Sequence, residues 1–191
     1  MKKIILASGS PRRKMLLEWA GIDFDVMVSE ADESFDASQS PSSIALTIAA
    51  NKNTAVAERL GVHFKEHVLI AADTIVVLGD QVIGKPSSRD HAIEILSALS
   101  GQTHEVITAV DIRSIHHKEF FYDTTKVSFH LLSEQDIIHY VDHYKPYDKA
   151  GAYAIQEWIG VIGIKSIHGD FYNVMGLPVS RVVSSLKKSF L

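Results

Sequence analysis

The sequence contains no cysteine, no long apolar run and no excess of positive charge. Without cysteine there can be no disulfide, thiolate zinc site, iron–sulfur cluster or cysteine nucleophile. No window approaches the roughly 18 apolar residues of a membrane-spanning helix. The 19 Lys and Arg residues face 23 Asp and Glu residues, and this net charge of −4 disfavours broad binding to nucleic acid or anionic membranes. We therefore expect a cytoplasmic protein that binds neither.

The residues that are present are typical of a globular chain. Its 191 residues are 46% hydrophobic and 22% charged, which predicts a single domain over residues 1–191. Candidate strands alternate with candidate helices, a pattern that predicts an α/β fold with a mixed sheet and flanking helices. The polar stretch 29–43 is expected to be an ordered loop or a mobile flap. Strands are predicted at 2–7, 25–28, 68–77, 81–83, 103–115, 119–131 and 159–167, and helices at 11–20, 41–60, 88–99, 133–144 and 178–188.

Two charged residues interrupt apolar patterns. Asp73 lies inside the run from Val68 to Val77, where a carboxylate is costly unless it is paired, hydrogen-bonded or bound to a metal. Lys52 follows Ile48 at helical spacing and so falls on the apolar stripe of the predicted helix 41–60. Asp73 could be a strand-end residue bonded to the backbone, and Lys52 could extend its ammonium to solvent. Both also fit an active site, where such residues often cluster.

A segment rich in small and basic residues follows the first predicted strand. Ser8-Gly9-Ser10-Pro11 leads directly into Arg12 and Arg13 at the start of a predicted helix. Backbone amides at a helix N-terminus and arginine side chains both bind phosphate. Cations at this end oppose the helix dipole, so two arginines here favour a bound anion. The alternative is that both arginines are exposed and bind nothing.

Glu33 belongs to an acidic cluster with Glu30, Asp32 and Asp36. Acidic loops are usually only solvated. Together with Asp73, Glu33 could ligate Mg²⁺, which commonly takes one or two carboxylates plus substrate phosphates.

The stretch from Gly79 to Lys85 matches the first part of a phosphate-binding P-loop. The motif then fails, because Pro86 stands where a serine or threonine hydroxyl should ligate Mg²⁺. We reject a P-loop but keep Lys85 as a candidate phosphate cation. His139 and His143 have the spacing of zinc ligands, but their helix face is interpreted as solvated.

Seven short motifs occur in order over nearly the whole chain. They are Leu6–Arg13, Asp32-Glu33, Ala72-Asp73-Thr74, Gly84-Lys85-Pro86, Ser100–Val106, Gly151-Ala152-Tyr153 with Gln156, and Asn173 with Gly176-Leu177-Pro178. Each is weak alone, but their order makes the set specific. Together they resemble the Maf family of nucleoside triphosphate pyrophosphatases.

This resemblance implies an elongated α/β fold with a deep cleft between two lobes, related to inosine triphosphatase. It implies hydrolysis of a nucleoside triphosphate to the monophosphate and pyrophosphate with Mg²⁺ or Mn²⁺. It also implies nucleotide-pool cleansing, a link to septum formation in cell division and, for many members, a homodimer.

The resemblance also implies roles for individual residues. Asp73 would accept a proton from water, bind the metal, or do both, and Glu33 would help to hold the metal. Lys52, Lys85 and Arg13 would neutralise the phosphates beside Ser8. Arg12, Thr74 and Gln156 match the dTTP/UTP type of the family, and a glutamine amide can both donate to and accept from a pyrimidine edge.

Two other functions stay open at this point. The chain could be a nucleotide-dependent inhibitor of septum formation whose hydrolysis is secondary. It could also belong to the 7-methyl-GTP type of the family.

Overall fold

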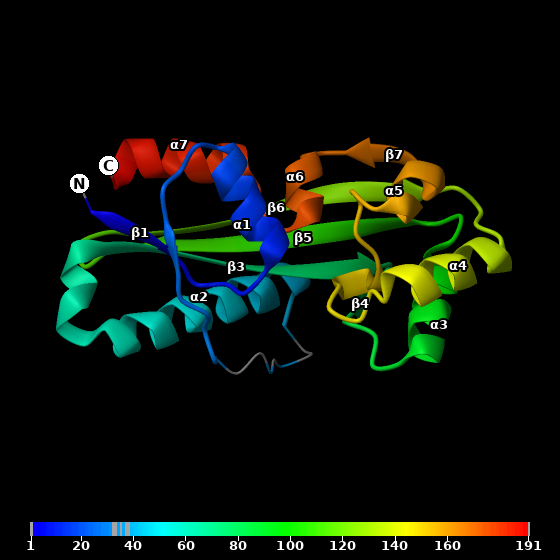
Figure 1. Cartoon of the computed structure of the whole chain (residues 1–191), viewed down its shortest axis with the longest axis horizontal. Helices are drawn as coiled ribbons and strands as arrows, with labels where there is room; N and C mark the ends of the chain where they lie inside the picture. Colours follow the sequence, from blue (N-terminus) through cyan, green and yellow to red (C-terminus); the bar gives the residue numbers. More distant parts are fainter. Residues whose placement is uncertain (1, 32–33, 35, 37–38, 191) are drawn as a thin grey trace. The chain divides into compact units, whose positions relative to one another are not determined.

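The computed structural model describes residues 2–31, 34, 36 and 39–190. Within them a mixed seven-stranded sheet has β4 (Gln81–Ile83) paired to β3, and its other strands follow the order β2 (Asp25–Val26), β1 (Lys3–Leu6), β3 (His67–Leu78), β5 (Thr103–Arg113), β6 (Lys118–Phe129) and β7 (Ile164–His168). Strand β1 is parallel to β2 and β3, whereas the β3–β4 and β6–β7 pairs are antiparallel. Helices accompany the strands, so the predicted α/β class with a mixed sheet is confirmed (Figure 1). The predicted elongated shape and cleft remain predictions.

The chain divides into two compact units. The first comprises Met1–Asp73, Thr108–Asp123 and Gly176–Leu191, and the second comprises Thr74–Ile107 and Thr124–Met175. Three strands, β3 (His67–Leu78), β5 (Thr103–Arg113) and β6 (Lys118–Phe129), pass from one unit into the other along their own length. The single domain over residues 1–191 stays a prediction.

The first unit holds the N-terminal strands and the longest helix. In Figure 1 its strands lie between α2 on one side and α1 and α7 on the other. Helix α2 begins after Ser40, whose side chain accepts a hydrogen bond from the Ser43 backbone, and ends at Gly61 with φ of +53°. Its elements are β1 (Lys3–Leu6), α1 (Pro11–Trp19), β2 (Asp25–Val26), α2 (Pro41–Leu60), the 3₁₀ helix η1 (Gly61–Glu66) and α7 (Val179–Ser189).

Helix α2 buries its apolar stripe against β1 and β3. Val56 packs in one cluster with Ile5 and Ala7 from the first strand segment and with Leu69 and Ala71 from β3. This packing fixes which face of α2 meets the sheet. Lys52, one helical turn before Val56, is therefore carried to the same side.

The second unit holds the remaining short elements. Helix α4 opens with the predicted capping box between Ser133 and Asp136, and α3 and α4 contact each other. Strand β4 pairs with the end of β3, so the stretch from Gly79 to Lys85 begins as a β-hairpin and is not a P-loop. The elements are β4 (Gln81–Ile83), α3 (Arg89–Leu99), α4 (Glu134–Tyr144), the 3₁₀ helix η2 (Ala150–Ala152), α5 (Trp158–Gly163), β7 (Ile164–His168) and α6 (Phe171–Met175).

The prediction of a strand over 159–167 is wrong in its first half. Residues 158–163 form the short helix α5, and only Ile164–His168 form a strand. A short apolar run cannot be assigned to helix or strand by periodicity alone. Within this helix, Gly160 approaches the carbonyl of Ile155 so closely that no side chain fits there. The short helix α6 was not predicted.

We expect Gly160→Ala to destabilise the protein by about 2 kcal/mol or more, because it forces extra volume into a packed backbone. A β-carbon at this position would lie 1.8 Å from the Ile155 carbonyl oxygen. Urea unfolding measures the change. Gly84→Ala is the matched control, because a β-carbon there meets nothing within 4 Å. Equal stability of the two variants would contradict the close approach.

Candidate functional site

The centre of the candidate site is an ion pair between Lys52 on α2 and Asp73 on β3. Lys52 Nζ donates a hydrogen bond to Asp73 Oδ1 at 2.7 Å. The two side chains are only 11% and 13% exposed. The sequence predicted both residues separately as misplaced charges, and the structure shows that they are partners within the first unit.

The second carboxylate oxygen of Asp73 is left for another group. Among the residues that the structure describes, none donates a hydrogen bond to Oδ2, although the side chain is largely enclosed. An enclosed carboxylate oxygen in this position suits a water molecule or a hard cation. The ion pair thus engages one oxygen of the Asp73 carboxylate, and no described residue donates a hydrogen bond to the other.

Asp73 fits a metal that is shared with substrate better than one held by protein alone. The described part of the chain contains no group of three or more metal-ligating side chains. Mg²⁺ usually keeps waters and takes one or two carboxylates plus substrate phosphates, so a single carboxylate is compatible with it. Glu33, the other predicted ligand, lies outside the described residues.

Arg13 is buried and anchors the loop that precedes α1. Its Nε donates to the carbonyl of Gly176 at 2.8 Å, and its Nη1 donates to Ser8 Oγ at 3.1 Å. The side chain therefore ties the strand-to-helix turn to the start of the C-terminal segment. The alternative of two exposed arginines does not hold for Arg13, whereas Arg12 beside it is half-buried.

The hydroxyl of Ser8 has its acceptor capacity occupied. It accepts hydrogen bonds from Arg13 Nη1 and from the backbone of Ser10, at 3.1 and 3.2 Å. A hydroxyl also carries one hydrogen to donate, and here no described residue accepts it. The Ser8 hydroxyl hydrogen is therefore available to an added acceptor.

The remaining predicted residues belong to the second unit. Thr74 directly follows Asp73 along β3 and is half-buried, whereas Lys85 and Gln156 are exposed. Lys85 follows Gly84, whose carbonyl accepts a hydrogen bond from the Gly151 backbone at 3.2 Å. The loop that carries Lys85 is thereby tied to the segment that leads to Gln156.

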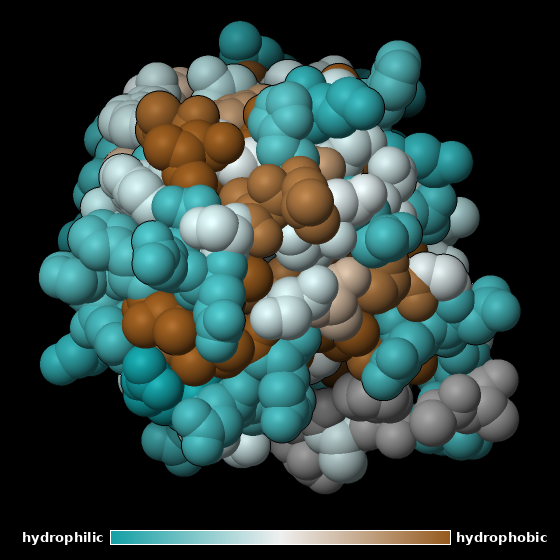
Figure 2. Space-filling model, turned by 90° about the vertical axis from the view of Figure 1, so that its right-hand side faces the viewer, coloured by the Kyte–Doolittle hydropathy of each residue, from teal (hydrophilic) through white to brown (hydrophobic). Residues whose placement is uncertain are grey.

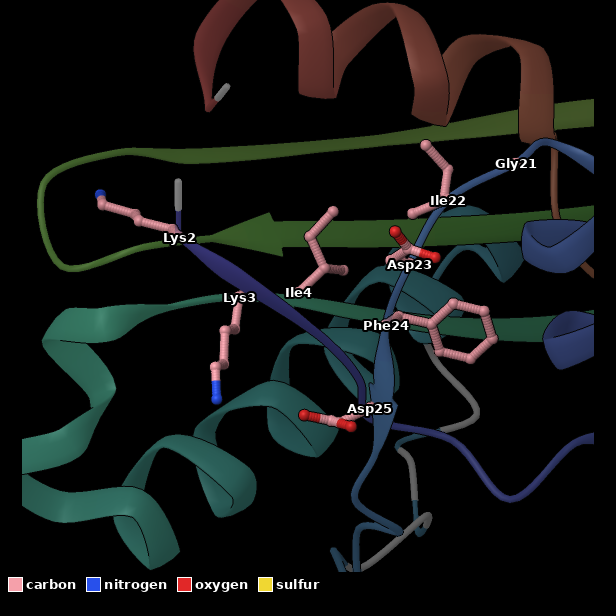
Figure 3. Close-up of a pocket in the computed structure, with 8 residues that line it drawn as sticks. All are labelled: Lys2, Lys3, Ile4, Gly21, Ile22, Asp23, Phe24 and Asp25. Atoms are coloured by element: carbon pink, nitrogen blue, oxygen red, sulfur yellow. The ribbon is translucent and has the colours of Figure 1, made fainter.

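A surface pocket at the start of β1 is not the candidate site. Lys2, Lys3, Asp23 and Asp25 are among the residues that line it (Figure 3). This pocket contains no predicted site residue, and its charges are of both signs. A polyphosphate would meet two carboxylates there, so the pocket is a poor match for the predicted substrate.

The two exposed histidines His139 and His143 lie one turn apart on α4, with ring centroids 4.2 Å apart. Their exposure is what the interpretation of a solvated face predicts.

On the face in Figure 2, apolar side chains form separate groups with hydrophilic residues between them. Such scattered exposure of apolar side chains is normal for a protein surface.

Comparison with known proteins agrees with the motif pattern. The family described as "Maf-like protein" matches residues 3–189. A dTTP/UTP pyrophosphatase of Bacillus cereus (strain G9842) is 49% identical over 188 residues, covering 98% of this chain and 96% of the relative. A dTTP/UTP pyrophosphatase of Cytophaga hutchinsonii is 49% identical over 187 residues, covering 98% and 84%. This chain belongs to the Maf family.

One solved structure was also compared with this Maf chain. The Staphylococcus aureus Ham1 protein superposes with a TM-score of 0.45 and 16% identity, covering 67% of this chain and 72% of that one. None of the helices in the described part of the Maf chain is long and apolar enough to cross a membrane.

A buried network beside the Maf ion pair was missed by the sequence reasoning. Asn53 Nδ2 donates to both the carbonyl and Oδ1 of Asp111, at 2.8 and 2.7 Å. Arg113 binds the same carboxylate with two hydrogen bonds of 2.7 Å and also reaches the carbonyl of Ala50 on α2. Asp111 interrupts an apolar run, the same signal that marked Asp73, and could have been found by it.

A second missed pair is buried in the second unit of the Maf chain. His104 Nε2 and the hydroxyl of Tyr153 share a hydrogen bond at 2.7 Å. Burial lowers the pKa of His104 to about 4 and raises the pKa of Tyr153. Both groups therefore stay uncharged at neutral pH.

We expect Arg13→Lys to lower the free energy of unfolding of the Maf chain by about 2 kcal/mol, although it keeps the charge. One ammonium cannot replace the two nitrogens that bind Gly176 and Ser8. Urea titration measures the loss. The control Arg59→Lys removes an exposed contact to Val28 and should cost under about 0.5 kcal/mol. An Arg13→Lys variant with the same free energy of unfolding as the wild type would show that these two hydrogen bonds do not stabilise the fold.

His104 makes the stability of the Maf fold depend on pH. The folded state takes up this proton only near pH 4, whereas an unfolded histidine does so near pH 6.5. The unfolded state binds more protons between these values, so stability falls as the pH falls through this window. From pH 7 to pH 5 we expect a loss of about 2 kcal/mol from this residue.

Urea unfolding at both pH values tests this, because His104→Gln should flatten the dependence and the exposed His139→Gln should not. An NMR titration of the His104 ring gives its pKa directly. A midpoint near 6.5 would overturn the prediction.

Proposed function

We propose that this chain hydrolyses dTTP and UTP to the nucleoside monophosphate and pyrophosphate. The observation that carries the proposal is the enclosed Lys52–Asp73 pair, whose Oδ2 atom accepts no hydrogen bond from any described residue. The chain that carries this pair is 49% identical in sequence to two proteins named dTTP/UTP pyrophosphatase. The geometry supplies a fixed carboxylate oxygen, and the relatives supply the substrate class.

In the proposed reaction, water attacks the α-phosphorus and the bond to the bridging oxygen breaks. Pyrophosphate leaves, and the proton of the attacking water passes to Asp73 Oδ2. Lys52 orients this carboxylate through Oδ1 and places a positive charge beside the reacting phosphate. A bound Mg²⁺ or Mn²⁺ would offset the charge of the triphosphate, with Asp73 and Glu33 as its proposed protein ligands.

The other site residues are proposed to bind the substrate. Ser8 donates its remaining hydrogen to a phosphate oxygen, and Arg13 adds its charge beside Ser8. Lys85 is a further phosphate cation. Arg12, Thr74 and Gln156 are proposed to select the base, with the exposed amide of Gln156 offering both a donor and an acceptor.

A cytoplasmic location, expected from the composition, and a homodimer, implied by the family resemblance, remain part of this proposal. Nucleotide-pool cleansing and a link to septum formation, which the resemblance also implies, belong to it as well.

Pyrophosphate release from dTTP, UTP, CTP and 7-methyl-GTP, each with Mg²⁺ or Mn²⁺, tests the activity. We expect dTTP and UTP to be the best substrates. Asp73→Asn should lower kcat at least a hundredfold, because the amide cannot take the proton. The matched control Asp142→Asn removes an exposed carboxylate paired with Arg89 and should leave kcat within about twofold.

Two outcomes would contradict the proposal. Nucleotide binding without turnover, identical in the wild type and Asp73→Asn, would favour a nucleotide-dependent regulator. A preference for 7-methyl-GTP would leave the enzyme class intact and overturn the assignment to the dTTP/UTP type.

A further inference from the structure

The segment that carries Gln156 is unusually well fixed. Residues 151–155 are all buried, and Gln156 is the first exposed residue after them. Gly151 and Ala152 both have positive φ, at +71° and +56°, a region that alanine rarely adopts. Such a backbone persists only when its surroundings hold it, so the contacts of the segment matter.

The first contact holds the segment before Gln156. The hydroxyl of Tyr153 bonds to His104 Nε2 on β5, as described above, and its ring packs edge-on against Phe129 on β6 at 5.2 Å. His104 stacks on the same phenylalanine at 5.5 Å. Tyr153 is thereby fastened to two sheet strands of the second unit through one hydroxyl and one ring.

The second contact bridges the two sides of Gln156. Tyr140 on α4 accepts a hydrogen bond from the Ala154 backbone at 3.1 Å and donates one to the carboxylate of Glu157. The Glu157 backbone donates in turn to the Ala154 carbonyl at 3.0 Å. One buried tyrosine hydroxyl therefore connects the residues on both sides of the exposed glutamine.

We propose that Tyr153 and Tyr140 are positioning residues that set base selectivity through Gln156. Phenylalanine would fill the same space without polar atoms to satisfy, so packing alone does not require these hydroxyls. Their effect is to fix the backbone from which the Gln156 amide reaches a pyrimidine edge. This inference rests on the proposed function, in which Gln156 reads the base. The ligand chemistry is a uracil or thymine ring, which offers one donor and adjacent acceptors.

Tyr153→Phe tests the inference, because it keeps the ring and removes only the bond to His104. We expect the preference for UTP over 7-methyl-GTP, measured as the ratio of kcat/KM values, to fall about tenfold. The loss should come mainly from a higher KM for UTP, since the proposed proton acceptor is elsewhere. A tenfold change corresponds to about 1.4 kcal/mol, within the range of one lost hydrogen bond.

Non-additivity separates positioning from general damage. Gln156→Ala should lower the same ratio, and Tyr153→Phe added to it should lower the ratio no further. Tyr140→Phe is a second, independent variant and should reproduce the pattern even if Tyr153→Phe folds poorly. Tyr122→Phe, at an exposed tyrosine of the first unit, is the matched control and should leave the ratio unchanged.

Equal losses for both nucleotides, or additive losses with Gln156→Ala, would overturn the inference. If the wild type releases no pyrophosphate from any nucleotide, the proposed function fails by itself. Calorimetric Kd values for UTP and 7-methyl-GTP in the same variants then test the positioning. The ratio of these Kd values should change in Tyr153→Phe, Tyr140→Phe and Gln156→Ala but not in Tyr122→Phe. An unchanged ratio in the first three variants would refute the inference.

Discussion

The contact between Lys52 and Asp73 is the constraint on which the first unit depends. Lysine and aspartate are both costly to enclose, and enclosing them together lowers that cost only if their atoms meet in good geometry. A distance of 2.7 Å requires α2 and β3 to be fixed in register and rotation. The packing of Val56 against β1 and β3 fixes the rotation of α2, and the polar network around Asp111 holds its position along the strands.

That network explains why a residue next to Lys52 is polar and fully buried. Asn53 binds Asp111 on β5 and also reaches the Leu69 carbonyl on β3 at 3.5 Å. Since Asn53 adjoins Lys52 in the chain, a shift of α2 along the sheet would break these bonds and the ion pair together. The neutral amide of Asn53 thus holds the helix in place, and the preceding residue, Lys52, presents its ammonium to Asp73. A purely apolar stripe would allow the helix more freedom to slide.

The order and type of most elements could be predicted from the sequence, because caps, turns and periodicity are local. Helix α2 was predicted with its observed bounds, Pro41–Leu60, and the hairpin after β3 was predicted from the turn at Gly79 and Asp80. The helix over residues 158–163 was not predicted, because periodicity alone cannot assign so short an apolar run to helix or strand. Misplaced charge identified Lys52 and Asp73 as candidates, but only folding could show that they are partners.

Arg13 and Lys52 show why charge alone does not assign a role. Both were predicted as phosphate cations, and both are buried, yet their partners differ in kind. Arg13 donates hydrogen bonds to the carbonyl of Gly176 and the hydroxyl of Ser8, and its forked guanidinium thereby joins two distant chain segments. Lys52 binds one oxygen of the Asp73 carboxylate. The same positive charge therefore has two different structural effects: Arg13 joins two chain segments through two hydrogen bonds, and Lys52 fixes the orientation of Asp73.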